Sequence, residues 1–357
     1  MKPKLNSLLI VTIATALIVC APRAQSQTDL DLPMQSQAAE VKQKIGVTDI
    51  TIKYHRPTVN GRKIWGALVP YGQTWRAGAN ENTTIDFSTP VSVEGKPLPA
   101  GTYGLHMIPT ADSWTVIFSK MAQAWGSYTY NQSEDALRVT VKARPNEMDE
   151  ALEYEFEDLK PDSAVVTMKW ERLAVPFKVS VSDTDSVFPS IRTQLRGRAQ
   201  YSWGPPNEAA QYCLAKKTNY EEGLKWAELS LQNEERFENL STKADLLQAL
   251  NRTDEAKKVR DHAMEIAKPG QIYTYARQLQ FQKRGDEAMP VFQALVKRSP
   301  NDVFGHLAQA RVKAAAGDFD GALSDAKAGL AVAESDQQKT AIKALIGRLD
   351  QKQDINK

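Results

Sequence analysis

Residues 151–156 read ALEYEF, and this short stretch sets the pattern for the first part of the chain. Three apolar residues alternate there with polar positions, among them the glutamates Glu153 and Glu155. Successive side chains of a strand point to opposite faces, so a period of two predicts a strand with one buried face and one wet face. We therefore expect an antiparallel sheet that packs on one side.

Runs with the same period lie on both sides of this segment, and turn-forming residues separate several of them. Asn60-Gly61, Glu94-Gly95-Lys96 and Ala100-Gly101 supply glycine where a tight turn needs it. The alternation predicts an antiparallel β-sandwich or jelly-roll-like domain over residues 35–183. Its core positions are expected at Ile50, Ile52, Tyr54, Ile85, Phe87, Tyr103, Leu105, Met107, Trp114, Val116, Phe118, Leu137, Val139, Val141, Val166, Met168, Trp170, Phe177, Val179 and Val181.

Residues 55–82 break the alternation and read HRPTVNGRKIWGALVPYGQTWRAGANEN. A loop of this length inside a compact domain is uncommon and is often functional. With Trp65, Tyr71 and Trp75 it is too apolar for a disordered segment. We therefore expect a structured loop across one end of the sandwich, with Gly78 supplying a turn of positive φ.

Several segments in this region, taken in order, resemble one protein family. They are YHRP (54–57), GRKIWG (61–66), WRAGANENT (75–83), AGTYGLHMIP (100–109), WTVIFSK (114–120), WGSYTY (125–130) and DALRV (135–139). The chain resembles, over about residues 35–182, a family of secreted bacterial proteins known as domain of unknown function 2911. The resemblance implies common descent and a shared fold, often with a repeat-like helical tail. It implies no reaction, since the family is named for lacking one.

The loop and its surroundings concentrate side chains suited to a small anionic or glycan ligand. Arginine presents a planar fork that matches carboxylate or phosphate. Glu81 and His106 are the catalytic candidates, because they would act as general acid and base if the fold brings them within hydrogen-bond reach. The ligand-binding candidates are Arg56, Arg62, Trp75, Arg76, Asn80, Glu81, Trp125 and Tyr130.

A structural role for the same side chains is the reading that the sequence favours. Arg56 or Arg76 paired with Glu81 or Asp135 would form a buried ion pair that fixes the long loop. Catalysis is the less favoured alternative, so the sequence favours a protein without enzymatic activity over an enzyme.

Motifs for other chemistries do not occur. The histidines His55, His106, His262 and His306 have no metal-ligand spacing, and a zinc site from His55, His106 and Glu81 has no support. The sequence contains no nucleophile elbow, phosphate-binding loop or dinucleotide fingerprint, and it offers no base partner for Ser119 or Ser127. We therefore expect no cofactor and no metal.

A second, longer period appears beyond residue 206. Gly223, Ala256, Ala288 and Ala322 occupy matching positions in four similar segments, at spacings of 33, 32 and 34 residues. This is the length of a tetratricopeptide repeat, in which a small residue marks the close crossing of two helices. We expect such repeats over residues 207–350, with a concave groove for a protein or peptide partner. Bracing of the β-domain is the alternative.

Two features of these helices depart from a regular pattern. Residues 184–206 are expected to form a connector, helical from Ile191 to Tyr201, with a stop at Gly204-Pro205-Pro206. Pro290 is expected just inside the first turn of its helix, where proline is tolerated.

The first residues predict export. Lys2 and Lys4 precede an apolar run from Leu8 to Val19, which is too short to span a bilayer and is typical of a cleaved signal peptide over residues 1–26. Val19 is too bulky for the residue before a lipidated Cys20, so we do not expect a lipoprotein. No later segment predicts a membrane span.

The net charge and the cysteine content limit the functions that remain possible. Removing residues 1–26 takes away three positive charges and turns the net charge from +2 to −1, which gives no basic face for nucleic acid. Only Cys213 would then remain, and we expect it to pack between helices. The sequence thus predicts a periplasmic or extracellular, non-enzymatic protein that binds a ligand or partner through its β-domain and proteins through its repeats. The alternative is an envelope hydrolase or transferase that acts on a glycan or small anion at the 55–82 loop.

Overall fold

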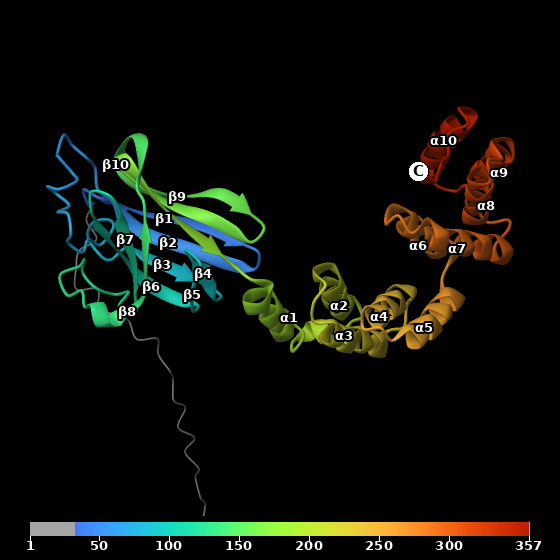
Figure 1. Ribbon diagram of the computed structural model, residues 1–357, viewed down its shortest axis with the longest axis horizontal. Coiled ribbons are helices and arrows are strands. Elements are labelled where there is room, and N and C mark those ends of the chain that lie inside the picture. The colour runs from blue at the N-terminus through green and yellow to red at the C-terminus, as the bar shows by residue number, and fades with distance from the viewer. Residues whose placement is uncertain (1–32, 357) are drawn as a thin grey trace, which may run out of the picture. The chain divides into compact units, whose positions relative to one another are not determined.

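The structure is a computed structural model that describes residues 33–356, and it divides into two units between Val181 and Ser182 (Figure 1). The expected signal segment, Cys20 included, lies outside the described residues.

Two antiparallel sheets form the N-terminal unit. One has the strand order β1-β2-β3-β6-β7-β8 and the other the order β5-β4-β10-β9, so antiparallel sheets are confirmed. The strands are β1 (Gln37–Ile45), β2 (Thr48–Arg56), β3 (Thr84–Phe87), β4 (Val91–Val93), β5 (Lys96–Leu98), β6 (Gly101–Pro109), β7 (Trp114–Ser119), β8 (Asp135–Val141), β9 (Arg144–Lys160) and β10 (Ser163–Ser180), with a 3-10 turn at Gln132–Glu134.

One hydrophobic core joins the two sheets. Ile50 and Ile52 of β2 and Met168 of β10 are fully buried, as the alternation predicted. The rings of Phe118 on β7 and Phe177 on β10 meet edge to face with their centroids 5.7 Å apart. Each such side chain contributes roughly 1.5–3 kcal/mol by leaving water. Burial of this shared core is therefore the main force that holds the sheets together.

Strand β6 departs from the predicted pattern because both of its faces are buried. Leu105 points into the core, but its neighbour His106 is also only 2% exposed. The segment after β7 covers that second face, and the carbonyl of Met121 lies so close to Gly104 that an added Cβ would sit 2.5 Å from it. Glycine is therefore required at this position by a close backbone approach.

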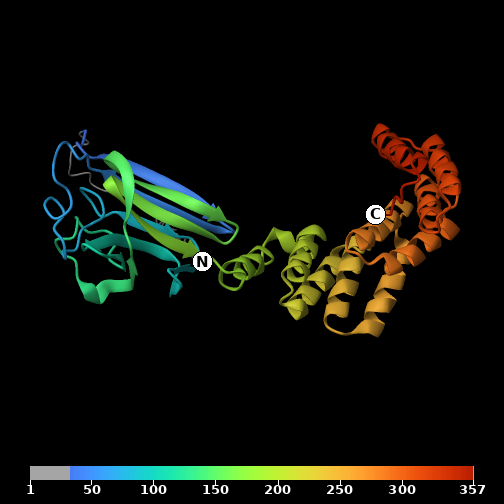
Figure 2. The same cartoon turned by 45° about the horizontal axis from the view of Figure 1, so that its top comes forward.

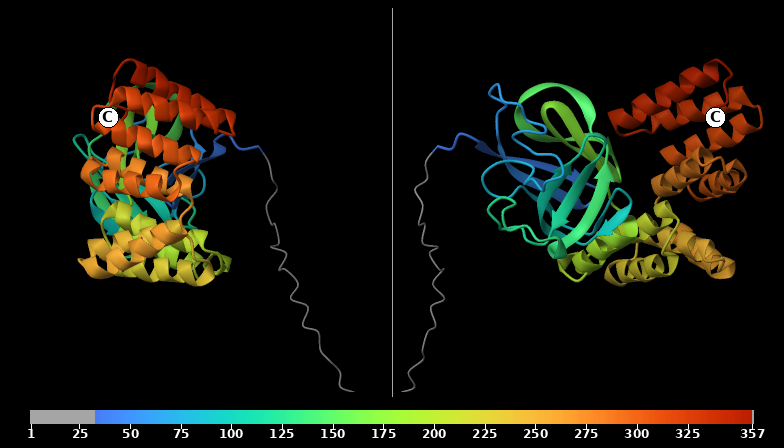
Figure 3. Two further views of the ribbon diagram at one scale, coloured as in Figure 1. Left: turned by 90° about the vertical axis from the view of Figure 1, so that its right-hand side faces the viewer. Right: turned by 60° about the vertical axis from the view of Figure 1, so that its left-hand side comes forward.

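Helices build the C-terminal unit, which runs from residue 182 to 356 (Figure 2). They follow one another as antiparallel pairs, α2 with α3, α4 with α5, α6 with α7 and α8 with α9, and α10 packs on the last pair (Figure 3). The helices are α1 (Phe188–Gln194), α2 (Gly204–Lys216), α3 (Tyr220–Asn233), α4 (Phe237–Ala249), α5 (Thr253–Ile266), α6 (Pro269–Phe281), α7 (Gly285–Arg298), α8 (Val303–Ala315), α9 (Phe319–Ala331) and α10 (Asp336–Asp350), with a π-helical turn at Asp183–Val187 and a 3-10 turn at Arg198–Tyr201.

The small residues that gave the repeat spacing lie where the paired helices cross. Ala256, Ala288 and Ala322 are fully buried at equivalent places on α5, α7 and α9. On α3, a Cβ added to Gly223 would lie 2.9 Å from the Cβ of Cys213 on α2. Cys213 is buried and free, and burial raises the pKa of its thiol to about 11. The repeat-like array predicted from the spacing is confirmed.

Three local expectations for the helices were wrong. Gly204-Pro205-Pro206 does not stop a helix but opens α2, because the first turn needs no amide hydrogens and proline already has a helical φ. Pro290 lies at the sixth residue of α7 rather than in its first turn, and the exposed ring is accommodated without ending the helix. The expected helix from Ile191 to Tyr201 is interrupted after α1 and resumes as a 3-10 turn. Among the helices of residues 33–356, none has the length and hydropathy of a membrane span.

Candidate functional site

The long loop between β2 and β3 is irregular but firmly attached to the sheets. Isolated bridges pair Thr58 with Ala151, and Trp75 with Met107 of β6. Trp75 and Met107 exchange both backbone hydrogen bonds at 2.8 Å. The loop lies at one end of the two sheets (Figure 1), so its side chains are held against the end of the core.

Four tryptophans meet beneath this loop. Trp65 and Trp75 come from the loop, and Trp114 and Trp170 come from β7 and β10. The indoles of Trp75 and Trp170 stack with their centroids 5.8 Å apart and their planes 19° apart. Trp170 is 1% exposed, whereas Trp75 is only partly buried. The Trp75 ring is therefore fixed by its tryptophan neighbours, and its exposed part lines a cavity.

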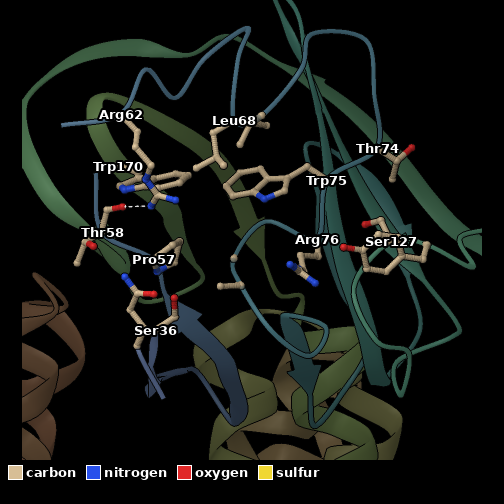
Figure 4. A pocket seen from close by; sticks show the side chains of 15 residues that line it. Ser36, Pro57, Thr58, Arg62, Leu68, Thr74, Trp75, Arg76, Ser127 and Trp170 are labelled. Carbon is tan, nitrogen blue, oxygen red and sulfur yellow. Dashed lines mark hydrogen bonds between the residues drawn. The ribbon is translucent and has the colours of Figure 1, made fainter. Parts of the chain in front are cut away.

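A cavity of about 390 Å³ opens over this cluster (Figure 4). We call it the aromatic–arginine pocket, and it is within the usual size of ligand sites. Its lining contains two arginines and several hydroxyl groups but no aspartate or glutamate. The lining residues are Gln35, Ser36, Pro57, Thr58, Arg62, Leu68, Val69, Thr74, Trp75, Arg76, Gly78, Ala79, Ser127, Tyr128 and Trp170.

The two arginines are anchored by backbone carbonyls rather than by acids. Arg62 donates to the carbonyl of Thr58 (Figure 4) and to that of Val59, and the Nη1 of Arg76 donates to the carbonyl of Asn80 at 2.8 Å. Within residues 33–356, neither guanidinium has a carboxylate partner. Both charges are thus held in place without being neutralised, which favours an anion in the pocket.

The hydroxyl group of Ser127 on the pocket wall is oriented from behind by a buried histidine. Its Oγ lies 2.8 Å from Nδ1 of His106 on β6. Burial lowers the pKa of His106 from 6.5 to about 4, so this imidazole is neutral at pH 7. The structure thus supplies a partner for Ser127 that the sequence did not reveal.

Tyr130 covers the other side of His106, with ring centroids 5.3 Å apart. Its hydroxyl donates to Oδ2 of Asp135 at 2.8 Å, and Asp135 also pairs with Arg138 at 3.2 Å. Burial, with Asp135 as the second cause, raises the pKa of Tyr130 to about 12. Tyr130 therefore holds the 121–130 segment in place instead of facing the pocket.

A second cavity, of about 760 Å³, lies beside the first sheet. Glu81 lines it and pairs with His55, whose Nδ1 lies 3.3 Å from Oε2 of Glu81. Trp125 is 59% exposed at its edge. Glu81 thus contacts His55, while His106 contacts Ser127, so the two catalytic candidates have different partners.

The helical unit carries a groove of about 1390 Å³ along the first helix of each pair. Its polar lining is dominated by amide and hydroxyl side chains, among them Gln248 and Gln278. The lining residues are Gln211, Leu214, Ala215, Lys217, Phe237, Glu238, Ser241, Thr242, Asp245, Gln248, Ala249, Lys268, Pro269, Gly270, Gln271, Thr274, Tyr275, Gln278, Leu279, Gln282, Arg284, Asp302 and Phe304.

Comparison with known proteins agrees with the predicted resemblance. Residues 36–179 match the family model described as Protein of unknown function (DUF2911). The DUF2911 region spans the sheets from β1 into β10 and contains every residue of the aromatic–arginine pocket except Gln35. The helical array follows it.

One solved structure is similar to part of this chain. It is YrrB, described as a TPR protein with an unusual peptide-binding site, at 15% sequence identity and a TM-score of 0.25 over 44% of this chain and 86% of that chain. No curated protein matches the sequence.

The structure distributes the eight ligand-binding candidates over three places in the DUF2911 region. Arg62, Trp75 and Arg76 line the aromatic–arginine pocket. Glu81 and Trp125 line the second cavity. The remaining three are engaged in structural contacts, and they are Arg56, Asn80 and Tyr130.

Two of these structural contacts tie the loop and strand ends together. Arg56 donates to the carbonyl of Leu152 at 2.8 Å and pairs with Glu153 at 2.9 Å, rather than with Glu81 or Asp135. Asn80 has φ of 57° and donates to the carbonyl of Ser36 at 3.3 Å.

The expectation that Gly78 supplies a positive φ was wrong. Ala77 and Asn80 take the positive φ values in this part of the loop. Gly78 is instead required because an added Cβ would lie 2.5 Å from Oγ1 of Thr83. In the described part of the chain, no group of three His, Cys, Asp or Glu side chains is placed to hold a metal ion.

Sequence reasoning missed Ser127, Tyr128 and Trp170 as pocket residues. Trp170 occupies a core position of its strand, and nothing in the sequence distinguishes it from other buried residues. The motif WGSYTY (125–130) did carry a signal, since it gathers three aromatic residues around one glycine.

Proposed function

We propose that this chain is a non-enzymatic, exported binding protein whose helical unit holds an extended polypeptide and whose sandwich-like β-unit holds a small anionic or glycan ligand. The observation that carries the proposal is the groove along α2, α4, α6 and the start of α8, because its lining contains five glutamine side chains. A primary amide donates and accepts at once, as an extended backbone does.

The groove's free amides support recognition of a backbone. Gln248 and Gln278 are exposed, and within residues 33–356 neither side chain makes a hydrogen bond. The charged lining consists of three cations and three anions, so net charge does not select the partner. Apolar contacts from Phe237, Tyr275 and Phe304 would instead take alternate side chains of the bound segment.

Contacts between the residues after α10 and the helices α6 and α8 support the proposal. Arg311 of α8 donates to the carbonyl of Ile355, whose side chain is 1% exposed. Gln280 of α6 donates to the side chain of Asn356 at 2.7 Å, and Asn356 donates to the carbonyl of Arg311 at 3.0 Å. Side chains of α6 and α8 thus hold this turn, and one of the contacts is made to a backbone carbonyl.

A hydrolase or transferase acting on a glycan or small anion is the second candidate function. Its support is the Ser127–His106 hydrogen bond at the pocket wall. A general base works best when its pKa is near the working pH. With a pKa of about 4, His106 is a poor proton acceptor at pH 7, which favours binding over catalysis. Turnover of acidic glycans by the wild type that is lost in Ser127→Ala and Glu81→Gln would reverse this preference.

Export is proposed from residues 1–26 alone. The mature protein should begin after Ser26 and carry a net charge of −1. Mass spectrometry of protein from the envelope fraction tests this, and an intact Met1 on that protein would contradict it.

Site-specific cross-linking tests the groove. A photoreactive phenylalanine analogue is placed at Gln278 in the groove, with Lys327 on the outside of α9 as the matched control position. Irradiation in envelope extract should cross-link polypeptides to position 278 and not to position 327. The cross-linked peptides should map to extended segments. Equal yields at both positions, or no product at 278, would overturn the proposal.

A further inference from the structure

We infer that the aromatic–arginine pocket binds an acidic saccharide, with a sugar ring on the indole of Trp75 and carboxylates held by Arg62 and Arg76. This inference rests on the proposed binding role of the β-unit and names the ligand class that the pocket fits.

The charge of the pocket selects an anion. Arg62 and Arg76 are its charged lining residues, and the lining contains no acid. Each guanidinium is steered by carbonyls of its own loop, Thr58 and Val59 for Arg62 and Asn80 for Arg76. Their remaining donors are left to form the paired hydrogen bonds that a carboxylate accepts.

The aromatic floor selects a ligand with an apolar face. Trp170 stacks on Trp75, so the indole is fixed, and Trp75 is partly exposed and lines the cavity. The C–H face of a pyranose packs on such a ring and loses little conformational freedom. In Figure 4, Arg62 lies to the left of Trp75 and Arg76 lies below it, so two cations are on different sides of the indole.

The hydroxyl groups of the wall favour a sugar over an aromatic acid. Ser36, Thr58, Thr74 and Ser127 line the pocket, and hydroxyl groups donate and accept toward sugar hydroxyls. Ser127 is oriented by neutral His106, so it adds a fixed polar contact without a charge. An aromatic acid would leave these groups without partners, at a cost in affinity.

Calorimetric titration of the mature full-length chain tests this with a matched pair of probes. Trigalacturonate carries three carboxylates, and its methyl ester is the same saccharide without the charges. We expect trigalacturonate to bind and the ester to bind at least about tenfold more weakly, since the charged hydrogen bonds are lost.

Variants locate the site. The double variant Arg62→Gln/Arg76→Gln should weaken the binding of trigalacturonate by about 30-fold or more. The double variant Arg62→Lys/Arg76→Lys should weaken this binding less, because the positive charges remain. Ser127→Ala should weaken it by about threefold to tenfold. Arg144→Gln is the matched control, since Arg144 is an exposed arginine of the same unit outside the pocket, paired with Glu157. Circular dichroism confirms folding of each variant.

The outcomes separate this inference from the proposed function. Absence of trigalacturonate binding, equal binding of the ester, or equal effects of the pocket and control variants would overturn the saccharide assignment. Binding of benzoate or inorganic phosphate in its place, lost in the double variant, would overturn the ligand class and leave the binding role of the β-unit standing. Cross-linking at Gln278 is in the other unit and is unaffected by any of these results.

Discussion

The imidazole of His106 and the hydroxyl group of Ser127 form a 2.8 Å hydrogen bond that runs from a buried strand to the wall of the aromatic–arginine pocket. Because His106 lies on the face of β6 that the 121–130 segment covers, its protonation state is set by the fold rather than by solvent. Burial lowers the pKa of this imidazole to about 4, which keeps it neutral at pH 7.

The low pKa of His106 predicts a pH-dependent stability. The unfolded chain takes up a proton near pH 6.5, whereas the folded chain does so only near pH 4. The unfolded state therefore binds more protons between these values, and stability falls as pH decreases from about 6.5 to about 4, by about 3 kcal/mol in total. Urea unfolding followed by circular dichroism at pH 7 and pH 4.5 measures this. His106→Gln should remove most of this contribution, and an unchanged pH dependence in that variant would contradict the assignment.

Nuclear magnetic resonance tests the same group directly. The imidazole signals of His106 should stay in the neutral form down to about pH 5, because protonation would place a charge in the core. The other three histidines of the chain serve as internal comparisons. A midpoint for His106 near 6.5 would show that solvent reaches the ring.

Arg56 should contribute to the stability of the β-unit. Its guanidinium ties β2 to β9 through the carbonyl of Leu152 and the carboxylate of Glu153. Both side chains of the ion pair are about one third exposed, so screening by water reduces its contribution. We expect Arg56→Ala to lower the free energy of unfolding by about 1 kcal/mol. Chemical denaturation measures this, with Glu153→Gln as the partner variant, and a loss confined to Glu153→Gln would contradict the arrangement.

Two glycine substitutions in the helical unit should have opposite effects on stability, because only one of the glycines lies at a close crossing of two helices. In Gly223→Ala the new Cβ would lie 2.9 Å from that of Cys213, so we expect a loss of about 1–3 kcal/mol. Gly347 on α10 is exposed and faces open space, so Gly347→Ala should stabilise its helix by about 0.5–1 kcal/mol. Thermal unfolding of the two variants compares them. A stable Gly223→Ala protein would contradict the close crossing.

Much of the fold could be predicted from the sequence because its signals are local. The alternation around Glu153 and Glu155 marks β9, and the matching positions of Gly223 and Ala256 mark the helix crossings. Strand β1 (Gln37–Ile45) was missed because it is a largely exposed edge strand with few apolar residues. Such a strand is held by backbone pairing with β2, and backbone pairing has little effect on the hydrophobic periodicity of the sequence.

The candidate site was less predictable because it is assembled from distant segments. Arg62, Trp75 and Arg76 share one loop, and its composition alone pointed to them. Ser127 and Trp170 reach the same pocket from other parts of the chain, and only the pairing of strands brings them there. For the same reason, the partners of Glu81 and His106 could not be read from sequence distance.

Isothermal titration of the helical groove with a peptide tests the central claim most directly. The segment recovered by cross-linking at Gln278 is synthesised and titrated into the wild type, the double variant Gln248→Ala/Gln278→Ala and the control Lys327→Ala. We expect the double variant to weaken binding by about tenfold or more, through loss of two amide contacts to the backbone, and the control to match the wild type. Equal affinity of all three proteins for the peptide would contradict a polypeptide-binding groove.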